Sequence, residues 1–328
     1  MTLWTREAFH SFAKALCSGL LLVVVSYREP YTPVPEKGGL TWRRPAGGVV
    51  AALDPVLRSV DTSLWVAAAS EAALPSEEAY GTRLAVPPES PAYTVRRVLL
   101  TPQEVEGFYF GFANEGLWPL CHIAFQRPAF RPSDWEQYQQ VNRRFAEAVL
   151  EEVGAGPAYV WVHDYHFALV PRFLKEARPD LVVGTFWHIP WPAPEVFRIC
   201  PYAPGLLEGL LANNLVGFHL RSYRDDFLAT AVREVPVRLD REAPGVLRDG
   251  TRTVALPFPI GVDYEDLARR ATSPEVEEAV DLWRERLSLD EYDFVLLGLE
   301  RFDYTKGIPE RFQALDRFLE KYPQFAGR

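Results

Sequence analysis

Cysteine is scarce in this 328-residue sequence, which contains only three. Cys17, Cys121 and Cys200 lie far apart, are odd in number and include no C-x-x-C pair. This spacing argues against a disulfide framework and against a thiolate zinc site, and it is typical of proteins from a reducing compartment. We therefore expect a cytoplasmic protein.

Long apolar runs and an excess of positive charge are also lacking. The run Leu20–Val25 is much shorter than the about 20 residues that span a bilayer, and no small-residue cleavage site follows it. The sequence has 35 Lys and Arg residues against 44 Asp and Glu residues, a formal net charge of −9. This balance argues against a nucleic-acid-binding surface. We expect neither nucleic acid nor a membrane as a partner, and any anion site must be a local cluster of cations and backbone N–H groups.

Short apolar runs alternate with amphipathic stretches along most of the chain. The runs predict strands buried on both faces, at Leu20–Val25, Tyr159–Val162, Leu181–Phe186, Leu215–Phe218 and Thr253–Leu256. The stretches predict helices at Val49–Ser59, Ser133–Val153, Ala168–Ala177, Gly205–Ala212 and Ser222–Val235. This alternation is typical of an α/β fold with a Rossmann-like, doubly wound parallel sheet. Two stretches depart from it: we expect a mobile loop at Tyr31–Trp42 and a surface excursion at Glu71–Ser90.

A second unit is expected to begin after the linker Pro257–Gly261, whose prolines and glycine interrupt regular structure. We therefore expect one domain over residues 1–260 and another over residues 261–328. The second contains a predicted helix at Glu275–Leu287, a buried strand at Phe294–Leu299 and a helix at Pro309–Tyr322. One strand and two helices cannot close an α/β core, so we expect an incomplete second domain.

Arg28 follows the first predicted strand directly. Ligands of open parallel sheets bind at the carboxyl ends of strands, and a planar guanidinium suits a phosphate or a carboxylate. The alternative is an Arg paired with a carboxylate at the sheet edge, and the residues alone leave both open.

Gly47 and Gly48 open the next predicted helix. Paired glycines at a helix N-terminus allow backbone N–H groups to approach a phosphate, and the helix dipole favours the negative charge. A plain Gly-Gly turn is the commoner explanation of such a dipeptide.

The segment Tyr109–Pro119 is rich in aromatic residues that small and polar residues interrupt. Aromatic faces stack on sugars, and Tyr and Asn bind hydroxyls. Tyr109 and Trp118 are therefore candidate substrate residues, and an aromatic core segment is the alternative.

Polar residues also follow the strands predicted at Tyr159–Val162 and Leu181–Phe186. His163 and His166 lie three apart, which makes a metal site conceivable, but no third ligand stands at helical spacing. Asp164 as an acidic residue that binds substrate hydroxyls is the more economical interpretation. His188 follows the next strand in the same way and is a further candidate.

Arg301 and Lys306 follow the strand predicted at Phe294–Leu299. Two cations at the end of a strand suit a nucleotide diphosphate. A solvated pair on a charged surface is the alternative.

Taken together, these residues resemble the trehalose-6-phosphate synthase family of glycosyltransferases. The resemblance rests on the order and spacing of motifs from position 21 onward. It is carried by Val-Ser-x-Arg at 25–28, Gly-Gly at 47–48, Tyr109 with Leu117-Trp118-Pro119, His163-Asp164-Tyr165-His166, His188-Ile189-Pro190-Trp191-Pro192, Gly217-Phe218, Pro259-Ile260-Gly261, and Glu300-Arg301-x-Asp303-Tyr304-x-Lys306-Gly307-x-Pro309-Glu310-Arg311.

The resemblance implies a GT-B fold, in which two Rossmann-like domains face each other across the active site. It also implies a hexosyltransferase that moves glucose, with retention, from a nucleotide diphosphate glucose to glucose 6-phosphate, giving trehalose 6-phosphate. No metal or other cofactor is expected. The family's roles fall on Arg28, Tyr109, Trp118 and Asp164 for the acceptor, on Gly47 and Gly48 for the donor phosphates, and on His188, Arg301 and Lys306 for catalysis at the donor glucose and the departing diphosphate.

Tyr27 departs from the family pattern, which usually has Asn beside the acceptor-binding Arg. One alternative is therefore a glucosylglycerol-phosphate synthase-like transferase with glycerol 3-phosphate as acceptor. The family's later donor-site residues and those that read the nucleobase are expected beyond Arg328, so a sugar-phosphate-binding fragment without catalytic activity is a second alternative. The sequence is compatible with a homo-oligomer but specifies no oligomeric state.

Overall fold

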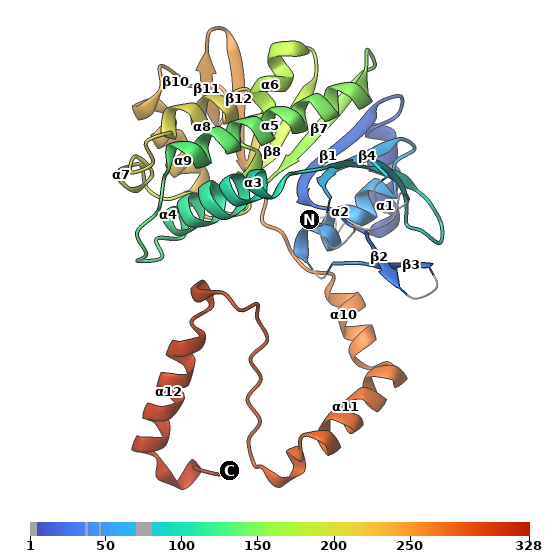
Figure 1. Cartoon of the computed structure of the whole chain (residues 1–328), viewed down its shortest axis with the longest axis vertical. Coiled ribbons are helices and arrows are strands. Elements are labelled where there is room, and N and C mark those ends of the chain that lie inside the picture. The colour runs from blue at the N-terminus through green and yellow to red at the C-terminus, as the bar shows by residue number, and fades with distance from the viewer. Residues whose placement is uncertain (1–4, 37–38, 46, 70–80) are drawn as a thin grey trace. The chain divides into compact units, whose positions relative to one another are not determined.

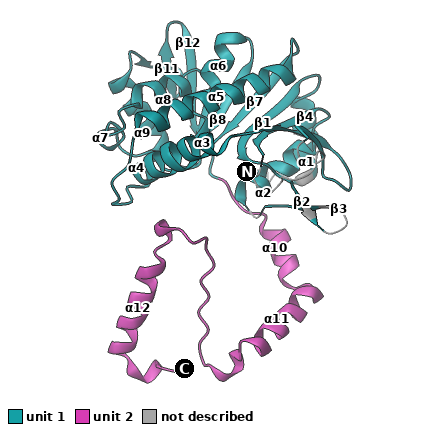
Figure 2. Cartoon of the chain, in the orientation of Figure 1, with its two compact units in different colours: residues 1–259 teal, residues 260–328 magenta. Residues whose placement is uncertain are grey.

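The computed structural model describes residues 5–36, 39–45, 47–69 and 81–328 of the chain (Figure 1). The chain divides into two compact units, residues 1–259 and residues 260–328 (Figure 2). No helix within the described ranges is long and apolar enough to cross a membrane.

A sheet of ten strands, counted within the described residues, forms the centre of the first unit. The strand order is β10-β11-β12-β9-β8-β7-β1-β4-β6-β5. The strands are β1 (Leu21–Arg28), β4 (Ser63–Ala68), β5 (Arg83–Val86), β6 (Tyr93–Val98), β7 (Ala158–His163), β8 (Val182–Phe186), β9 (Leu215–Phe218), β10 (Arg238–Leu239), β11 (Gly245–Arg248) and β12 (Thr251–Pro257). The strands from β12 to β6 run parallel, whereas β5, β11 and β10 add antiparallel edges.

Helices cover both faces of this sheet. On one face Phe145 of α5 (Pro132–Val153) belongs to the same hydrophobic cluster as Val23 and Val25 of β1, and α5 runs across the sheet (Figure 1). On the other face Leu53 of α2 (Gly48–Leu57) packs in a cluster with Val24. The alternation of Val23, Val24 and Val25 between two cores explains why the first five residues of β1, Leu21–Val25, are all apolar.

The remaining helical elements of the first unit are of different lengths and include one π-helix. They are α1 (Arg6–Leu16), α3 (Pro102–Glu104), the π-helix η2 (Val105–Leu117), α4 (Trp118–His122), the 3-10 turn η3 (Tyr165–Phe167), α6 (Val170–Ala177), α7 (Pro194–Phe197), α8 (Ala203–Leu210) and α9 (Arg221–Glu234).

The α/β class and the doubly wound, mainly parallel sheet predicted from the sequence are confirmed. The five strands and five helices predicted for the first unit are present, and their ends differ by a few residues. The helix predicted from Ser133 begins at Pro132, because proline suits the first turn of a helix. It ends, as predicted, at Gly154, whose φ of 55° favours glycine.

The prediction of a mobile loop at Tyr31–Trp42 is wrong. Within it lie β2 (Thr32–Glu36) and β3 (Gly39–Arg43), which pair as an antiparallel ribbon. Both strands are edges, where proline is tolerated. Buried Tyr31 also hydrogen-bonds through its hydroxyl to Asp54 of α2, at 3.3 Å, and thereby ties the ribbon to the core.

The prediction of a surface excursion at Glu71–Ser90 is wrong in part. Residues 71–80 lie outside the described residues. Arg83–Val86 forms the edge strand β5, and its alternate residues Leu84 and Val86 are buried. The composition of this stretch concealed the period of two that marks a strand with one buried face.

The second unit contains three helices and three 3-10 turns within its residues, all of which are described. They are α10 (Tyr264–Ala271), α11 (Pro274–Arg286), η4 (Leu289–Glu291), η5 (Tyr304–Lys306), α12 (Ile308–Lys321) and η6 (Pro323–Phe325). The helices predicted at Glu275–Leu287 and Pro309–Tyr322 are confirmed. The buried strand predicted at Phe294–Leu299 is wrong: the segment is not a strand, and Leu297 is 87% exposed. A strand needs a neighbour to take its backbone hydrogen bonds, and the second unit contains none.

Candidate functional site

The strand order of the first unit reverses at β1 and β7. From β1 the chain builds β4 and β6 on one side, and from β7 it builds β8 and β9 on the other. Ligands of such sheets bind outside the carboxyl ends of the strands at this reversal. Arg28 ends β1, and His163 and Asp164 stand at the end of β7, so the candidate residues of the first unit meet at this edge.

Arg28 lines a cavity of about 330 Å³ at this edge. Its side chain is exposed and has no ion-pair or hydrogen-bond partner among the described residues. No described carboxylate pairs with Arg28, so the described residues do not support the alternative of an Arg paired at the sheet edge. The cavity is lined by Tyr27, Arg28, Glu29, Thr32, Pro45, Ala68, Ala69, Leu100, Val105, Tyr109 and Phe110.

Two tyrosines form an aromatic wall of this cavity. The rings of Tyr27 and Tyr109 stack with 4.2 Å between their centroids and an interplanar angle of 12°. The buried ring of His166 lies almost parallel to both, 5.6 Å from Tyr27 and 5.4 Å from Tyr109. The π-helix η2 carries Tyr109, and π-helices are rare and frequent at functional sites. A flat wall beside a free cation suits a phosphorylated sugar.

Trp118 does not line this cavity. It opens α4, where its ring lies 4.0 Å from the ring of His122 and 6.0 Å from that of Tyr165, measured between centroids. Its predicted contact with the acceptor stays a prediction.

Asp164 uses its carboxylate to hold the backbone. Its Oδ1 atom accepts hydrogen bonds from the N–H groups of Tyr165, at 2.9 Å, and of His188, at 3.2 Å. Its own N–H donates to the carbonyl of Phe186 at 2.7 Å. Burial raises the pKa of Asp164 to about 7, although hydrogen bonds from backbone N–H groups oppose this shift. Its predicted bond to an acceptor hydroxyl stays a prediction.

His188 is joined to His163 through their rings. The Nδ1 atom of His163 lies 3.0 Å from the Nε2 atom of His188. Burial, and then the neighbouring His188, hold the pKa of His163 well below its usual value. Burial, and then His219, lower the pKa of His188 to about 4. Both rings are therefore neutral near pH 7.

His166 lies in the turn η3 directly after β7 and is buried. Burial lowers its pKa to about 3, and the positive charge of Arg28 and the neighbouring His188 add to this shift. Within the described part of the chain, no three His, Cys, Asp or Glu side chains come together as a group that could hold a metal ion.

Gly47 and Gly48 stand at the N-terminus of α2, and both are exposed. A Cβ atom at either position would meet nothing within 4 Å. The first N–H groups of a helix lack helical partners, so this end remains open to an anion. Neither glycine lines the Arg28 cavity, although Pro45 does.

Arg301 and Lys306 belong to the second unit. Arg301 is exposed, with its Nη2 atom 3.6 Å from Asp303 Oδ2, and Lys306 ends the turn η5. Burial would raise the pKa of Asp303, but hydrogen bonds from Thr305 and the charges of Arg301 and Lys306 hold it below its usual value. The two cations thus flank one carboxylate, and their predicted contact with a diphosphate stays a prediction.

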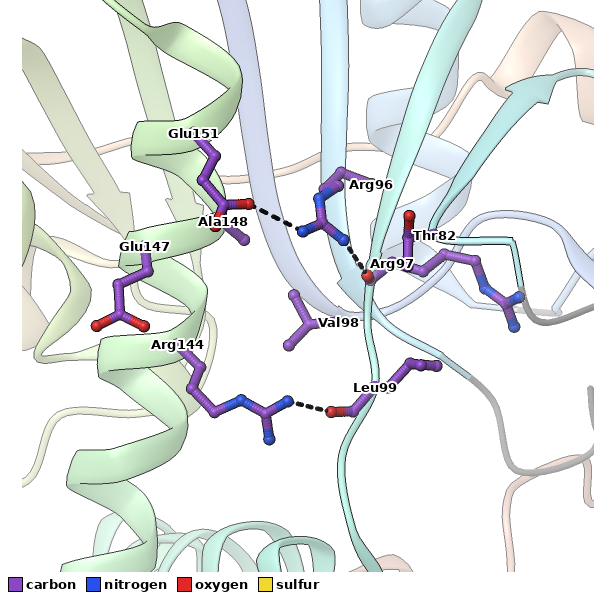
Figure 3. A pocket seen from close by; sticks show the side chains of 9 residues that line it. All are labelled: Thr82, Arg96, Arg97, Val98, Leu99, Arg144, Glu147, Ala148 and Glu151. Atoms are coloured by element: carbon purple, nitrogen blue, oxygen red, sulfur yellow. Dashed lines mark hydrogen bonds and ion pairs between the residues drawn. The ribbon is translucent and has the colours of Figure 1, made fainter.

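A second cavity, of about 290 Å³, lies between β6 and α5 (Figure 3). Arg96 donates to Glu151 at 3.0 Å and to the carbonyl of Arg97 at 2.8 Å. Arg144 donates to the carbonyl of Leu99 at 2.6 Å, as Figure 3 also shows. Arg97 donates to Glu29 at 2.8 Å. Each guanidinium of this cavity is engaged by the protein, in contrast to Arg28.

Sequence reasoning missed several residues of the Arg28 cavity. Thr32, Pro45 and Phe110 line it from segments that are distant in sequence. Thr32 lies in the stretch that the sequence predicts as a loop, Pro45 stands just before the Gly47-Gly48 pair, and Phe110 lies in the aromatic segment Tyr109–Pro119, but none of the three is itself a candidate there. Tyr27 stood out only as a departure from the family pattern. The ring pair of His163 and His188 joins two motifs that had been interpreted one at a time.

Comparison with known proteins gives one consistent family. The model of glycosyltransferase family 20 matches residues 21–328. A trehalose-6-phosphate synthase of Mycolicibacterium vanbaalenii is 36% identical over 316 residues, which cover 94% of this chain and 63% of that protein. Another, of Mycolicibacterium gilvum, is 38% identical over 308 residues, covering 91% and 60%.

Solved structures agree with these relatives. A structure from E. coli, bound with UDP-2-fluoro glucose, has 28% identity and a TM-score of 0.75, covering 93% of this chain and 62% of that one. An α,α-trehalose-phosphate synthase (UDP-forming) from Burkholderia xenovorans, in complex with glucose-6-phosphate, has 27% identity and a TM-score of 0.76, covering 94% and 64%. The predicted GT-B type is confirmed. The chain spans less than two thirds of the length of these relatives.

Proposed function

This chain belongs to glycosyltransferase family 20, and we propose that it forms the acceptor-binding side of a retaining glucosyltransferase of trehalose biosynthesis. The reaction moves glucose from a nucleotide diphosphate glucose to glucose 6-phosphate and gives trehalose 6-phosphate. The donor and acceptor classes are those of the solved relatives, one bound with UDP-2-fluoro glucose and one with glucose-6-phosphate.

The observation that carries this proposal is the free guanidinium of Arg28 in a cavity at the reversal of strand order. A planar guanidinium without a protein partner can donate charge-assisted hydrogen bonds to a phosphate dianion. Glu29 lines the same cavity, but its carboxylate is neutralised by the buried Arg97. The stacked rings of Tyr27 and Tyr109 supply the flat surface on which a sugar packs.

The chemical step follows from the groups assigned to the donor. The acceptor hydroxyl attacks the anomeric carbon, the bond from that carbon to the diphosphate oxygen breaks, and the departing diphosphate takes the hydroxyl proton. No side chain acts as nucleophile. Arg301 and Lys306 stabilise the negative charge that grows on the leaving group more than the charge of the ground state. Neutral His188 binds an oxygen of the donor glucose.

Calorimetric titration of the chain with glucose 6-phosphate and with glucose tests the acceptor site. We expect Arg28→Ala to weaken binding of glucose 6-phosphate by about 10- to 100-fold, the value of one charge-assisted hydrogen bond, and to leave binding of glucose nearly unchanged. Arg172→Ala is the matched control, because Arg172 lies on α6 and pairs with Glu176 and Glu208 at the surface. Equal losses for the two sugars would contradict the phosphate contact.

Nucleotide release tests the transfer itself. The chain is incubated with UDP-, GDP- or ADP-glucose and with glucose 6-phosphate or glycerol 3-phosphate. Glycerol 3-phosphate is included because Tyr27, the departure from the family pattern, lines the cavity next to Arg28. We expect release with glucose 6-phosphate and its loss in Arg301→Ala. No release from any pair would contradict catalysis by this chain.

A further inference from the structure

His188 is held at two points by two consecutive residues, His163 at the end of β7 and Asp164 directly after it. Asp164 binds its backbone N–H at 3.2 Å, and His163 contacts its ring at 3.0 Å. The first contact fixes where the main chain leaves β8. The second fixes the rotation of the imidazole and, because one proton lies between the two nitrogens, also decides which nitrogen of His188 carries hydrogen.

The surroundings of His163 decide where that proton belongs. His163 is 2% exposed, and its Nε2 atom is buried with no hydrogen-bond partner among the described residues. A neutral imidazole has one N–H and one bare nitrogen. If the N–H were at Nε2, a buried donor would be orphaned, which is rarer in proteins than an orphaned acceptor. If the N–H is at Nδ1, the only donor of the ring is used.

We propose that His163 is a positioning residue that donates its Nδ1–H to His188 Nε2 and thereby holds His188 as the tautomer protonated at Nδ1. No described residue hydrogen-bonds to that second nitrogen of His188, and the His188 side chain is partly exposed, unlike that of His163. His188 therefore presents an uncharged N–H donor to a ligand oxygen. That this oxygen belongs to a donor glucose rests on the proposed function, whereas the tautomer does not.

Neutrality of both rings is supported by their surroundings. Burial disfavours a charge on His163, and its neighbour His188 disfavours it further. Burial, and then His219, whose ring centroid lies 5.5 Å from that of His188, disfavour a charge on His188. The carboxylate of Asp164 is turned to backbone N–H groups. Burial and the neighbouring histidine rings therefore both disfavour a positive charge on either ring.

Nuclear magnetic resonance of the ¹⁵N-labelled chain tests the inference directly. The proton between the rings shows a large one-bond coupling to the nitrogen that carries it and a small coupling across the hydrogen bond. We expect the large coupling to His163 Nδ1, with His188 Nε2 appearing as a bare nitrogen. A proton bonded to His188 Nε2 would overturn the proposal. The His188 signals are assigned by their loss in His188→Asn and the His163 signals by their loss in His163→Leu, and His10→Asn, an exposed site on α1, should shift neither ring.

Two variants separate positioning from mere packing. In His163→Leu the donor is gone, and we expect His188 to lose its single tautomer. In His163→Asn the side-chain amide can donate from the position of Nδ1, and we expect the Nδ1–H tautomer of His188 to return. A His188 that keeps this tautomer in His163→Leu would refute the role of His163. If His163→Leu does not fold, the one-bond coupling in the wild-type chain still shows which of the two nitrogens carries the proton.

UDP-glucose separates this inference from the proposed function. A displaced His188 Nδ1–H signal on addition of UDP-glucose supports the donor role. If the coupling places the proton on His163 but UDP-glucose moves nothing, the tautomer stands and the donor contact of His188 fails. If UDP-glucose binds but the proton lies on His188 Nε2, the positioning role of His163 fails alone.

Discussion

The Oδ1 atom of Asp164 accepts a hydrogen bond from the backbone N–H of His188, which joins the end of β7 to the segment after β8. Asp164 has a φ of 74° and a ψ of 172°, a region that glycine adopts freely and other residues adopt at a cost of about 1–3 kcal/mol. The hydrogen bonds of its carboxylate hold the turn in this strained conformation. Asp164 therefore combines a strained backbone with the hydrogen bonds that stabilise it.

Replacement of Asp164 by Gly or by Ala separates these two contributions. Both variants lose the carboxylate, but only glycine relieves the backbone. We expect Asp164→Ala to be less stable than Asp164→Gly by about 1–2 kcal/mol, because the relief exceeds the entropic cost of glycine. Urea unfolding followed by tryptophan fluorescence measures the difference. An alanine variant as stable as the glycine variant would show that the turn is not strained.

The ion pair of Arg97 with Glu29 is almost completely buried, with side chains that are 1% and 2% exposed. Removal of one partner leaves an uncompensated buried charge. We expect Arg97→Met and Glu29→Gln each to lower the free energy of unfolding by about 3–5 kcal/mol. Glu29 also lines the Arg28 cavity, so Arg97→Met should weaken binding of glucose 6-phosphate in the folded fraction.

A surface pair provides the control for this prediction. Arg172 and Glu176 are 2.7 Å apart on α6, with side chains 47% and 52% exposed. Arg172→Met should cost less than about 1 kcal/mol. Arg97→Met and Arg172→Met with similar effects would indicate that water screens the buried pair.

Acid sensitivity of the fold should depend on His166. Its pKa is about 3 in the folded chain and about 6.5 in the unfolded chain. As the pH falls below about 6.5, the unfolded state binds a proton that the folded state does not, so stability decreases by up to about 1.4 kcal/mol per pH unit. His166→Phe keeps a ring beside Tyr27 and Tyr109 but cannot bind the proton. We expect this variant to lose about 2 kcal/mol less than the wild type between pH 7 and pH 5.

Unfolding curves at several pH values test this difference in slope. His163 and His188, whose pKa values are also lowered, still titrate in the variant, so part of the acid sensitivity should remain. His10→Phe, at an exposed position on α1, should keep the wild-type slope. A His166→Phe variant with that same slope would show that His166 is protonated in the folded state.

The sequence predicted the sheet and the residues at its carboxyl edge because both depend on local pattern. Apolar runs marked β1 and β7, and polar residues that directly follow parallel strands must lie at one edge. Arg28, Asp164 and His188 were found in this way. Contacts between distant segments have no local sequence pattern that would predict them. Glu29 and Arg97, for example, form an ion pair but lie 68 positions apart, and neither is in a recognisable motif.

The wrong loop prediction at Tyr31–Trp42 and the wrong strand prediction at Phe294–Leu299 have the same origin. Tyr31–Trp42 contains prolines and glycines that are typical of loops, yet a buried carboxylate, Asp54, anchors it as a ribbon. Phe294–Leu299 is apolar enough for a strand, yet no neighbouring strand of its unit accepts its hydrogen bonds. In both segments the structure depends on a distant group, the Asp54 carboxylate in one and a neighbouring strand in the other. The local sequence does not reveal whether that group is present.

Gly209 of α8 packs closely against the backbone that directly follows the turn carrying His166. A Cβ atom there would overlap the carbonyl oxygen of Ala168 and lie 2.9 Å from the Cα atom of Leu169, two backbone groups that cannot rotate away. We expect Gly209→Ala to destabilise the chain by about 1–3 kcal/mol, although alanine favours a helix by about 1 kcal/mol. Gly205→Ala in the same helix is the control, because its Cβ meets only a side chain, the ring of Trp135 at 3.2 Å, and no backbone atom. Thermal unfolding compares the two. A Gly209→Ala variant as stable as Gly205→Ala would mean that α8 can move away from this turn, and the position of His166 would then not depend on that helix.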